Sequence, residues 1–320
     1  MPRMSGLAMA ASLKKADDQL PVVFMTGAPQ LADAMKAVEL GAFRYLTKPV
    51  DPAIARQVAA DAIHWGRLAR LSVGSEALSE RAALDEAFGR ATSSLWMAYQ
   101  PIFAPRTRAL FGYEALLRSN EPALPSPPAV IEAAEKLGHL HALGRQLRDM
   151  VADQLRRAQP LAHTFFVNLH ASDLVDPLLY EPESPLAAFA RSVVLEITER
   201  ASIEGLSEVE SRIARLRQMG YRIAIDDLGA GYAGLSYFAR IGPDVVKIDM
   251  SLTRGIDADP LRQRLVGSLC SLSRELHMTV VAEGIETEAE LAVVTDLGVD
   301  LVQGYLLGRP APFPADPPRP

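Results

Sequence analysis

From Leu95 onward, short apolar runs alternate with longer amphipathic segments. Eight runs have the length and the β-branched or aromatic content of strands, and they are WMAYQPIF, ALFGYEALL, TFFVNL, VVLEIT, RIAIDD, DVVKID, TVVAEG and DLVQG. Segments with helical spacing separate most of them, at 141–157, 206–219, 260–276 and 287–297. Strands that alternate with helices predict an α/β protein, and eight such strands predict a TIM-like (β/α)8 barrel.

The first two runs are connected differently from the others. Only the five residues APRTR separate them, which suits a hairpin turn and not a crossover helix. We therefore expect one of the first strands to run antiparallel to its neighbour.

The N-terminal part holds a smaller pattern of strand, helix and strand. Apolar runs at 22–26 (VVFMT) and 43–47 (FRYLT) flank an amphipathic stretch at 31–40. An alanine-rich segment from Pro52 to about Arg90 predicts a connecting helix, or two helices divided near Gly74. The expected division is a partial α/β unit over 1–70, a helical linker over 71–92, a barrel over 93–312 and a tail over 313–320.

Composition narrows the class of protein. Hydrophobic residues make up 49% and charged residues 22% of the 320 residues, and no apolar run approaches the length of about 20 residues that spans a bilayer. The single cysteine, Cys270, excludes an internal disulfide and fits a reducing compartment, so we expect a cytoplasmic protein without a membrane partner. The net charge of −6 offers no basic surface for DNA or RNA polymers, and a small anionic ligand would need cations.

Polar residues stand at or near the ends of seven of the eight runs. They are Glu114, Asn168, Glu196, Asp226, Asp227, Lys247, Asp249, Glu283 and Gln303. The C-terminal ends of barrel strands meet on one rim, where reacting groups are found. Any one of these side chains could cap a helix or pair with a surface arginine. Together they place five carboxylates beside one lysine and the nearby Arg118, and these are Glu114, Glu196, Asp226, Asp227 and Glu283. Divalent cations that prefer oxygen ligands, Mg²⁺ or Mn²⁺, would balance that charge better than zinc.

The adjacent aspartates are the most informative pair. Neighbouring residues on a strand point to opposite sides, but the chain turns where a strand ends, so Asp226 and Asp227 could reach one metal cluster. We predict that this pair bridges two ions.

Seven segments resemble, in order, the motifs of EAL-domain cyclic diguanylate phosphodiesterases. They are YEALLR (113–118), FVNLH (166–170), LEITER (195–200), IDDLGAGYAGL (225–235), VKID (246–249), VAEGIE (281–286) and VQGY (302–305), within roughly 95–310. The resemblance implies a barrel with one antiparallel strand. It also implies metal-dependent hydrolysis of cyclic diguanylate (c-di-GMP) to the linear dinucleotide pGpG.

The resemblance also implies roles for single residues. One metal ion would be held by Glu114, Asn168, Glu196 and Asp226, and a second by Asp226, Asp227 and Glu283. Lys247 would orient the attacking water or help to deprotonate it, with Gln303 nearby; a buried ion pair with Asp249 is the alternative for Lys247. Substrate contacts would come from Gln100, Leu116, Arg118, Asp249 and Glu286, although Gln100 also suits a loop hydrogen bond and Leu116 core packing.

The loop after the paired aspartates departs from the family pattern. Leu228 and AGYAGL stand where the family commonly has phenylalanine and TGYSSL, and Glu199 would steady this loop. The departure predicts a looser loop and keeps a second interpretation open, a catalytically silent c-di-GMP receptor. A third is a scaffold that acts only through the N-terminal unit. We expect the phosphodiesterase to be a homodimer.

Residues 1–70 resemble the C-terminal half of a response-regulator receiver domain. Thr26 matches its switch hydroxyl, Tyr45 its switch aromatic residue, and Lys48 the lysine that precedes a proline, usually in a cis peptide. The strand with the phosphoacceptor would come before MPRMSGL, so an upstream histidine kinase is expected only if a full-length receiver exists.

Overall fold

The computed structural model describes residues 5–17, 20–28, 35–37, 40–159, 162–198, 208–229 and 241–314, without the side chains of Ala16, 65–78 and Thr198. The chain divides into two compact units, residues 1–84 and 85–320.

The first unit contains a small parallel sheet. Helix α1 (Gly6–Ala16) begins at Ser5, whose hydroxyl accepts from the Ala8 amide at 3.2 Å, an N-terminal cap. Strands β1 (Val23–Thr26) and β2 (Arg44–Thr47) pair in parallel, with Thr26 opposite Thr47. The two predicted strands are confirmed. Of the predicted helix between them, residues 35–37 are described and are helical.

One long helix follows this sheet. Helix α3 (Pro52–Ser94) begins after Asp51, whose carboxylate accepts from the Ala53 amide at 2.6 Å, and proline occupies the first helical position. The helix continues through Gly74. A single glycine costs a helix about 1 kcal/mol relative to alanine, which the surrounding alanines offset. The segment therefore forms one helix and not two.

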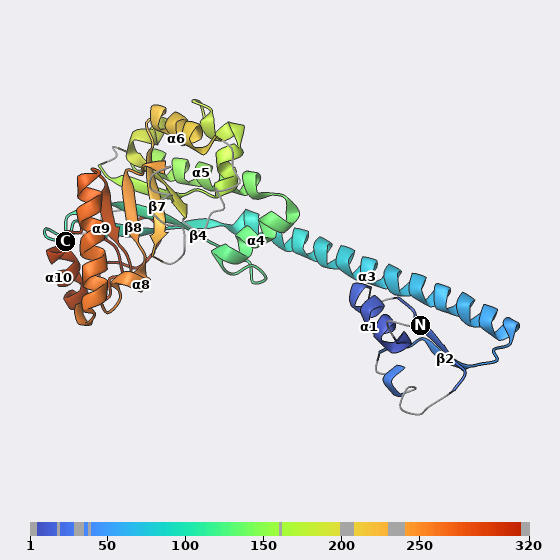
Figure 1. Ribbon diagram of the computed structural model, residues 1–320. Helices are drawn as coiled ribbons and strands as arrows, with labels where there is room; N and C mark the ends of the chain where they lie inside the picture. Colours follow the sequence, from blue (N-terminus) through green and yellow to red (C-terminus); the bar gives the residue numbers. More distant parts are fainter. Residues whose placement is uncertain are drawn as a thin grey trace. The chain divides into compact units, whose positions relative to one another are not determined.

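The second unit is a closed barrel of eight strands (Figure 1). The strands are β3 (Trp96–Phe103), β4 (Leu110–Arg118), β5 (Thr164–Asn168), β6 (Val193–Thr198), β7 (Arg222–Leu228), β8 (Val245–Ile248), β9 (Thr279–Ala282) and β10 (Leu301–Val302). Strand β3 runs antiparallel to both β4 and β10, and the other neighbours are parallel. The predicted barrel with one antiparallel strand is confirmed.

Helices cover the outside of the strands, as Figure 1 shows for α5, α6, α9 and α10. The α-helices of this unit are α4 (Pro127–Leu137), α5 (Leu140–Arg157), α6 (Val209–Gln218), α8 (Met250–Thr253), α9 (Pro260–Glu275) and α10 (Glu288–Asp296). The connection from β5 to β6 instead carries three 3-10 helices, η1 (Ala171–Val175), η2 (Pro177–Tyr180) and η3 (Ala187–Ser192), and η4 (Ile256–Ala258) precedes α9. The four long predicted helices are thus present. Within the described part of the chain, no helix has the length and apolar character needed to cross a membrane.

Two layers of apolar side chains hold the barrel together. The inner layer draws on every strand and consists of Ile102, Phe111, Phe166, Val194, Ala224, Val245, Val281 and Leu301. Outside the strands, the Phe313 ring packs against Tyr99 and Tyr113 with centroid distances of 5.1 Å to each, so the chain is held to the barrel at least as far as Phe313. Cys270 belongs to α9 and is buried.

Candidate active site

The inner apolar layer fixes where the predicted site residues lie. Successive residues of a strand point to opposite faces, so the residue two positions further along points inward again. Two positions beyond the inner layer stand Asn168, Glu196, Asp226, Lys247, Glu283 and Gln303. Because β3 runs in the opposite direction, Gln100 stands two positions before Ile102. One polar layer therefore closes the C-terminal end of the barrel.

Lys247 lies at the centre of this layer and is fully buried. Its Nζ is 3.3 Å from Glu114 Oε2, 2.8 Å from Glu196 Oε1, 3.2 Å from Asp226 Oδ1 and 2.6 Å from Glu283 Oε1. Asp249 is not among these partners, because its carboxylate accepts from the Ser251 amide at 2.9 Å and caps α8. The alternative of a Lys247–Asp249 ion pair is therefore wrong.

The electrostatics of the layer follow from burial and from Lys247. Burial alone would lower the pKa of Lys247, but the four carboxylates raise it well above its usual value. Burial raises the pKa of Glu196, and it raises that of Glu283 to about 8. Burial would also raise the pKa of Glu114, but the Lys247 ammonium and hydrogen bonds from Gln303 and Asn168 lower it. One ammonium therefore stabilises only part of this negative charge.

A break in strand geometry brings both aspartates into the site. The pairing of β7 with β8 shifts register between Ile225 and Leu228, and Asp227 has a φ of 60°. This left-handed conformation is uncommon for residues other than glycine and redirects the side chain that would otherwise point out of the barrel. Ligand atoms of Asp226, Asp227 and Glu283 consequently lie within 4.8 Å of one another.

The carboxylates fall into two groups that share one member. Glu114, Glu196 and Asp226 form the first group, also within 4.8 Å, and Asp226 belongs to the second as well. Glu196 Oε2 is buried and accepts no hydrogen bond from the described residues. When all five carboxylates are ionised, Lys247 leaves a charge of −4, which two divalent cations would neutralise. The residues therefore fit a pair of oxygen-preferring ions.

Two amide side chains hold Glu114 in place, and a third holds one of them. Gln303 Nε2 donates to Glu114 Oε2 at 2.7 Å and to Gln100 Oε1 at 2.9 Å, and Asn168 Nδ2 donates to Glu114 Oε1 at 3.2 Å. Gln100 Nε2 donates in turn to the Gly308 carbonyl at 3.0 Å. Gly308 lies in a loop. The loop hydrogen bond, one of the two interpretations of Gln100 from the sequence, is therefore present.

The residues expected to contact substrate surround this layer. Arg118, at the end of β4, is half-buried and donates to the Leu117 carbonyl at 2.7 Å, and Leu116 is half-buried. Glu286 is exposed and pairs with Arg254. Glu199 lies outside the described residues, as do residues 230–240 of the loop that departs from the family pattern.

Thr26 ends β1, Tyr45 lies within β2 and Lys48 follows β2. Thr26 Oγ1 accepts from the Ala28 amide at 3.2 Å, and the Lys48 amide donates to the Thr26 carbonyl at 2.6 Å. The Tyr45 ring contacts Phe24 with centroids 6.5 Å apart. The peptide between Lys48 and Pro49 is cis.

Two buried residues that the sequence analysis did not identify support the site. The Thr253 hydroxyl donates to the Glu283 carbonyl. The buried Glu290 carboxylate accepts from the amides of Gly255 at 2.7 Å, Glu286 at 2.9 Å and Thr287 at 3.0 Å, which joins the loop after β8 to the loop after β9. The signal for Glu290 is the sequence Thr-x-x-Glu at 287–290, a capping box.

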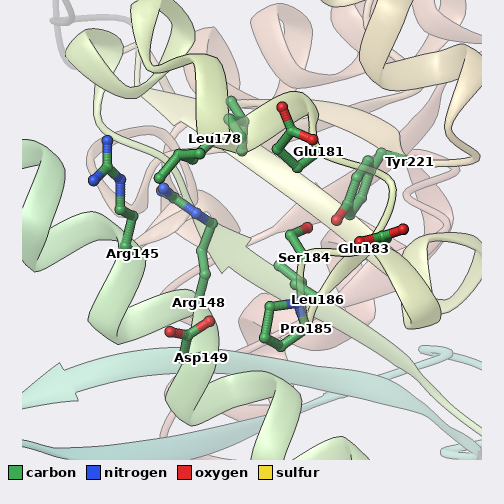
Figure 2. A pocket seen from close by; sticks show the side chains of 11 residues that line it. Arg145, Arg148, Asp149, Leu178, Glu181, Glu183, Ser184, Pro185, Leu186 and Tyr221 are labelled. Carbon is green, nitrogen blue, oxygen red and sulfur yellow. The ribbon is translucent and has the colours of Figure 1, made fainter.

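A separate cavity of about 420 Å³ lies outside the barrel, between α5 and the segment 178–186. Figure 2 shows Arg145, Arg148 and Asp149 on one helix, with the Arg148 side chain reaching toward Leu178. The two guanidiniums are already paired, since Arg145 contacts Asp176 at 2.6 Å and Arg148 contacts Asp173 at 3.1 Å. Neither guanidinium is therefore free to bind an anion in this cavity.

Comparison with known proteins decides the family. The EAL domain matches residues 81–310. The chain belongs to the EAL domain family. A response regulator receiver domain matches residues 1–59.

Named relatives of this EAL domain include two bacterial proteins. One is the probable cyclic di-GMP phosphodiesterase PdeG of Escherichia coli, 34% identical over 224 residues, which cover 67% of this chain and 44% of that protein. The other is the cyclic di-GMP phosphodiesterase NbdA of Pseudomonas aeruginosa, 32% identical over 231 residues, which cover 69% of this chain and 29% of that protein. The chain thus spans less than half the length of these relatives.

Solved structures share the fold of this EAL domain. The phosphodiesterase PaMucR in complex with c-di-GMP is 30% identical, with a TM-score of 0.64, and the match covers 72% of this chain and 98% of that one. The EAL enzyme Bd1971, bound to cAMP and cyclic di-GMP, is 25% identical, with a TM-score of 0.65 and coverage of 87% and 77%.

Proposed function

We propose that this chain hydrolyses c-di-GMP to linear pGpG with the help of two divalent cations, Mg²⁺ or Mn²⁺. The observation that carries the proposal is Asp226, which belongs to two carboxylate groups beside the buried Lys247. The family membership and the names of the relatives support the same substrate.

The ligand assignment follows the two carboxylate groups. Glu114, Asn168, Glu196 and Asp226 would hold one ion, and Asp226, Asp227 and Glu283 the other. When bound, the ions supply Lewis-acid stabilisation of the phosphoryl oxygens and make a water molecule more acidic.

The protein's own side chains orient the reactants. Lys247 Nζ contacts members of both carboxylate groups, so it can reach a water molecule held between them, and we assign it the orientation of the attacking water. Gln303 and Gln100 fix the position of Glu114 by hydrogen bonds. On the rim, Arg118 would bind a phosphate, where guanidinium geometry suits two oxygens.

The other proposed roles are contacts to the guanine bases of the substrate, and the division of the chain into domains. Gln100 and Leu116 would contact a guanine base, with Asp249 and Glu286 also in the substrate site. We retain the division into a receiver-like unit, a helical linker, an EAL barrel and a tail, with assembly as a homodimer in the cytoplasm.

Turnover by Glu114→Ala tests the proposed site. Purified protein is incubated with c-di-GMP and Mg²⁺, and the nucleotides are separated by chromatography. We expect pGpG formation by the wild-type chain and by Glu132→Ala, since the Glu132 carboxylate is exposed and pairs with the exposed Lys136. We expect about a hundredfold less from Glu114→Ala. Equal turnover by the two variants would contradict the site, and c-di-GMP that is bound but unchanged by the wild type would favour the receptor.

A further inference from the structure

The cavity between α5 and the segment 178–186 carries unpaired negative charge. Asp149 lines it from α5, and Glu181 and Glu183 line it from the facing segment (Figure 2). All three side chains are exposed, and none of them forms an ion pair with another of the described residues. The carboxylates therefore stand on two sides of one cavity, and their charge is available to a ligand.

The two arginines of the cavity do not cancel this charge. Arg145 donates to both oxygens of Asp176, from Nη2 at 2.6 Å and from Nε at 2.8 Å. Arg148 is buried and pairs with Asp173 at 3.1 Å. Each guanidinium is thus balanced by an aspartate, and neither aspartate is among the residues that line the cavity. The site keeps a net negative charge, which favours a cationic ligand.

Tyr221 places an unused hydrogen-bonding group in the same cavity. Its residue exposes only 3% of its surface, and the hydroxyl points into the cavity (Figure 2). This hydroxyl has no hydrogen-bond partner among the described residues, whereas buried polar groups usually have one. Burial raises the pKa of Tyr221 to about 12, so the group stays neutral near pH 7 and its oxygen can accept from an ammonium. The missing partner points to a ligand that donates hydrogen bonds.

The three carboxylates are spread along the cavity and apolar side chains accompany them. They do not form a group whose ligand atoms lie within 4.8 Å of one another, in contrast to the two groups around Asp226. A single metal ion could therefore not contact all three. Leu178, Pro185 and Leu186 line the same cavity, and its volume of about 420 Å³ lies within the usual range of ligand pockets, about 300–1,000 Å³. The arrangement suits an elongated ligand with a cation at each end and an apolar chain between them.

We propose that this cavity binds an aliphatic diamine, with one ammonium at Asp149 on α5 and the other at the two glutamates beside the Tyr221 hydroxyl. An ammonium only donates hydrogen bonds, which matches carboxylates and a hydroxyl oxygen that accept them. The alkyl chain would pack on the leucines and the proline of the lining. The proposal does not depend on the hydrolysis of c-di-GMP, because diamine binding is measured without the dinucleotide.

Calorimetric titration of the full chain, without c-di-GMP, tests for a site with two cation-binding ends. The probe is diaminobutane with an ammonium at each end, and butylamine is the matched ligand that lacks the second ammonium. We expect diaminobutane to bind at least about tenfold more tightly, because its second ammonium adds charge-assisted hydrogen bonds. Absence of diaminobutane binding, or binding no tighter than that of butylamine, would overturn the proposal.

Two aspartates of α5 distinguish this site from a general attraction of amines to an acidic protein. Asp149→Asn removes the carboxylate on the α5 side and should lower the affinity for diaminobutane to that for butylamine. Asp153→Asn makes the same change in net charge at an exposed aspartate that does not line the cavity, so the preference for diaminobutane should persist. An equal loss of affinity in both variants would show general attraction and overturn the proposal.

Tyr221→Phe tests the other end of the cavity without a change of charge. It should weaken the binding of both amines about tenfold, because each places an ammonium beside the hydroxyl. Thermal unfolding without ligand separates binding from folding. Since the hydroxyl has no partner among the described residues, its removal should not lower the Tm of the ligand-free protein. An unchanged affinity of Tyr221→Phe for diaminobutane would overturn the proposal.

Discussion

Replacing Lys247 by methionine tests whether Lys247 orients the attacking water, because this change should leave the binding of divalent cations intact. Methionine keeps much of the length of the side chain but removes the ammonium that contacts four carboxylates at 2.6–3.3 Å. Removing one partner of a buried ion pair costs about 3–5 kcal/mol, because the remaining charges stay buried. For a domain of this size, that corresponds to a fall in Tm of roughly 6–20 °C in the metal-free protein.

The same change has opposite expected effects on binding and turnover. Without the ammonium, the carboxylates attract divalent cations at least as strongly, so Mg²⁺ should still bind and should recover much of the lost stability. Turnover should fall by about a hundredfold or more, the typical contribution of a positioned proton-transfer or water-orienting group.

The assays are calorimetric titration with Mg²⁺, thermal unfolding with and without Mg²⁺, and chromatography of pGpG. Lys136→Met is the matched control, since its ammonium pairs with exposed Glu132 and should cost little. Wild-type turnover in Lys247→Met would refute the assigned role. Loss of Mg²⁺ binding by a folded variant would refute the charge argument.

Three further predictions concern the carboxylates. Asp226→Asn should weaken both cation sites and lower turnover by about a hundredfold, measured by titration and chromatography; loss of only one bound ion would contradict the shared ligand. Ca²⁺ should support binding of c-di-GMP with little pGpG formation, because its larger and looser coordination makes water less acidic; turnover equal to that with Mg²⁺ would contradict this. In EDTA, Tm should fall from about pH 5 to about pH 8, because the pKa of Glu283 is raised to about 8 and the folded state loses its stabilising proton over that range. Mg²⁺ should make the Tm less dependent on pH. A Tm that rises from pH 5 to pH 8 in EDTA would contradict the reasoning.

The sequence predicted the barrel and most of the site because their signals are local. A two-residue period puts Glu196, Lys247 and Glu283 on the inner side of their strands, and the short APRTR connection requires an antiparallel neighbour. The order of the motifs then indicates which strand ends meet. These features depend on neighbouring residues in the chain and are readable without coordinates.

Contacts between distant segments could not be predicted in the same way. The four partners of Lys247 come from the ends of four different strands, and they meet only when the barrel closes. The left-handed backbone of Asp227 depends on the register of β7 against β8. The packing of Phe313 on Tyr99 likewise joins the end of the described chain to the first barrel strand.

The central claim is that the two carboxylate groups around Asp226 make this EAL domain a metal-dependent phosphodiesterase. The most direct test is a single-turnover reaction with excess metal-free protein over c-di-GMP, started by Mg²⁺ and followed by chromatography. We predict that c-di-GMP stays intact in EDTA and is converted fully to pGpG after Mg²⁺ is added. If c-di-GMP bound to saturating protein stayed cyclic in the presence of Mg²⁺, that result would contradict the account.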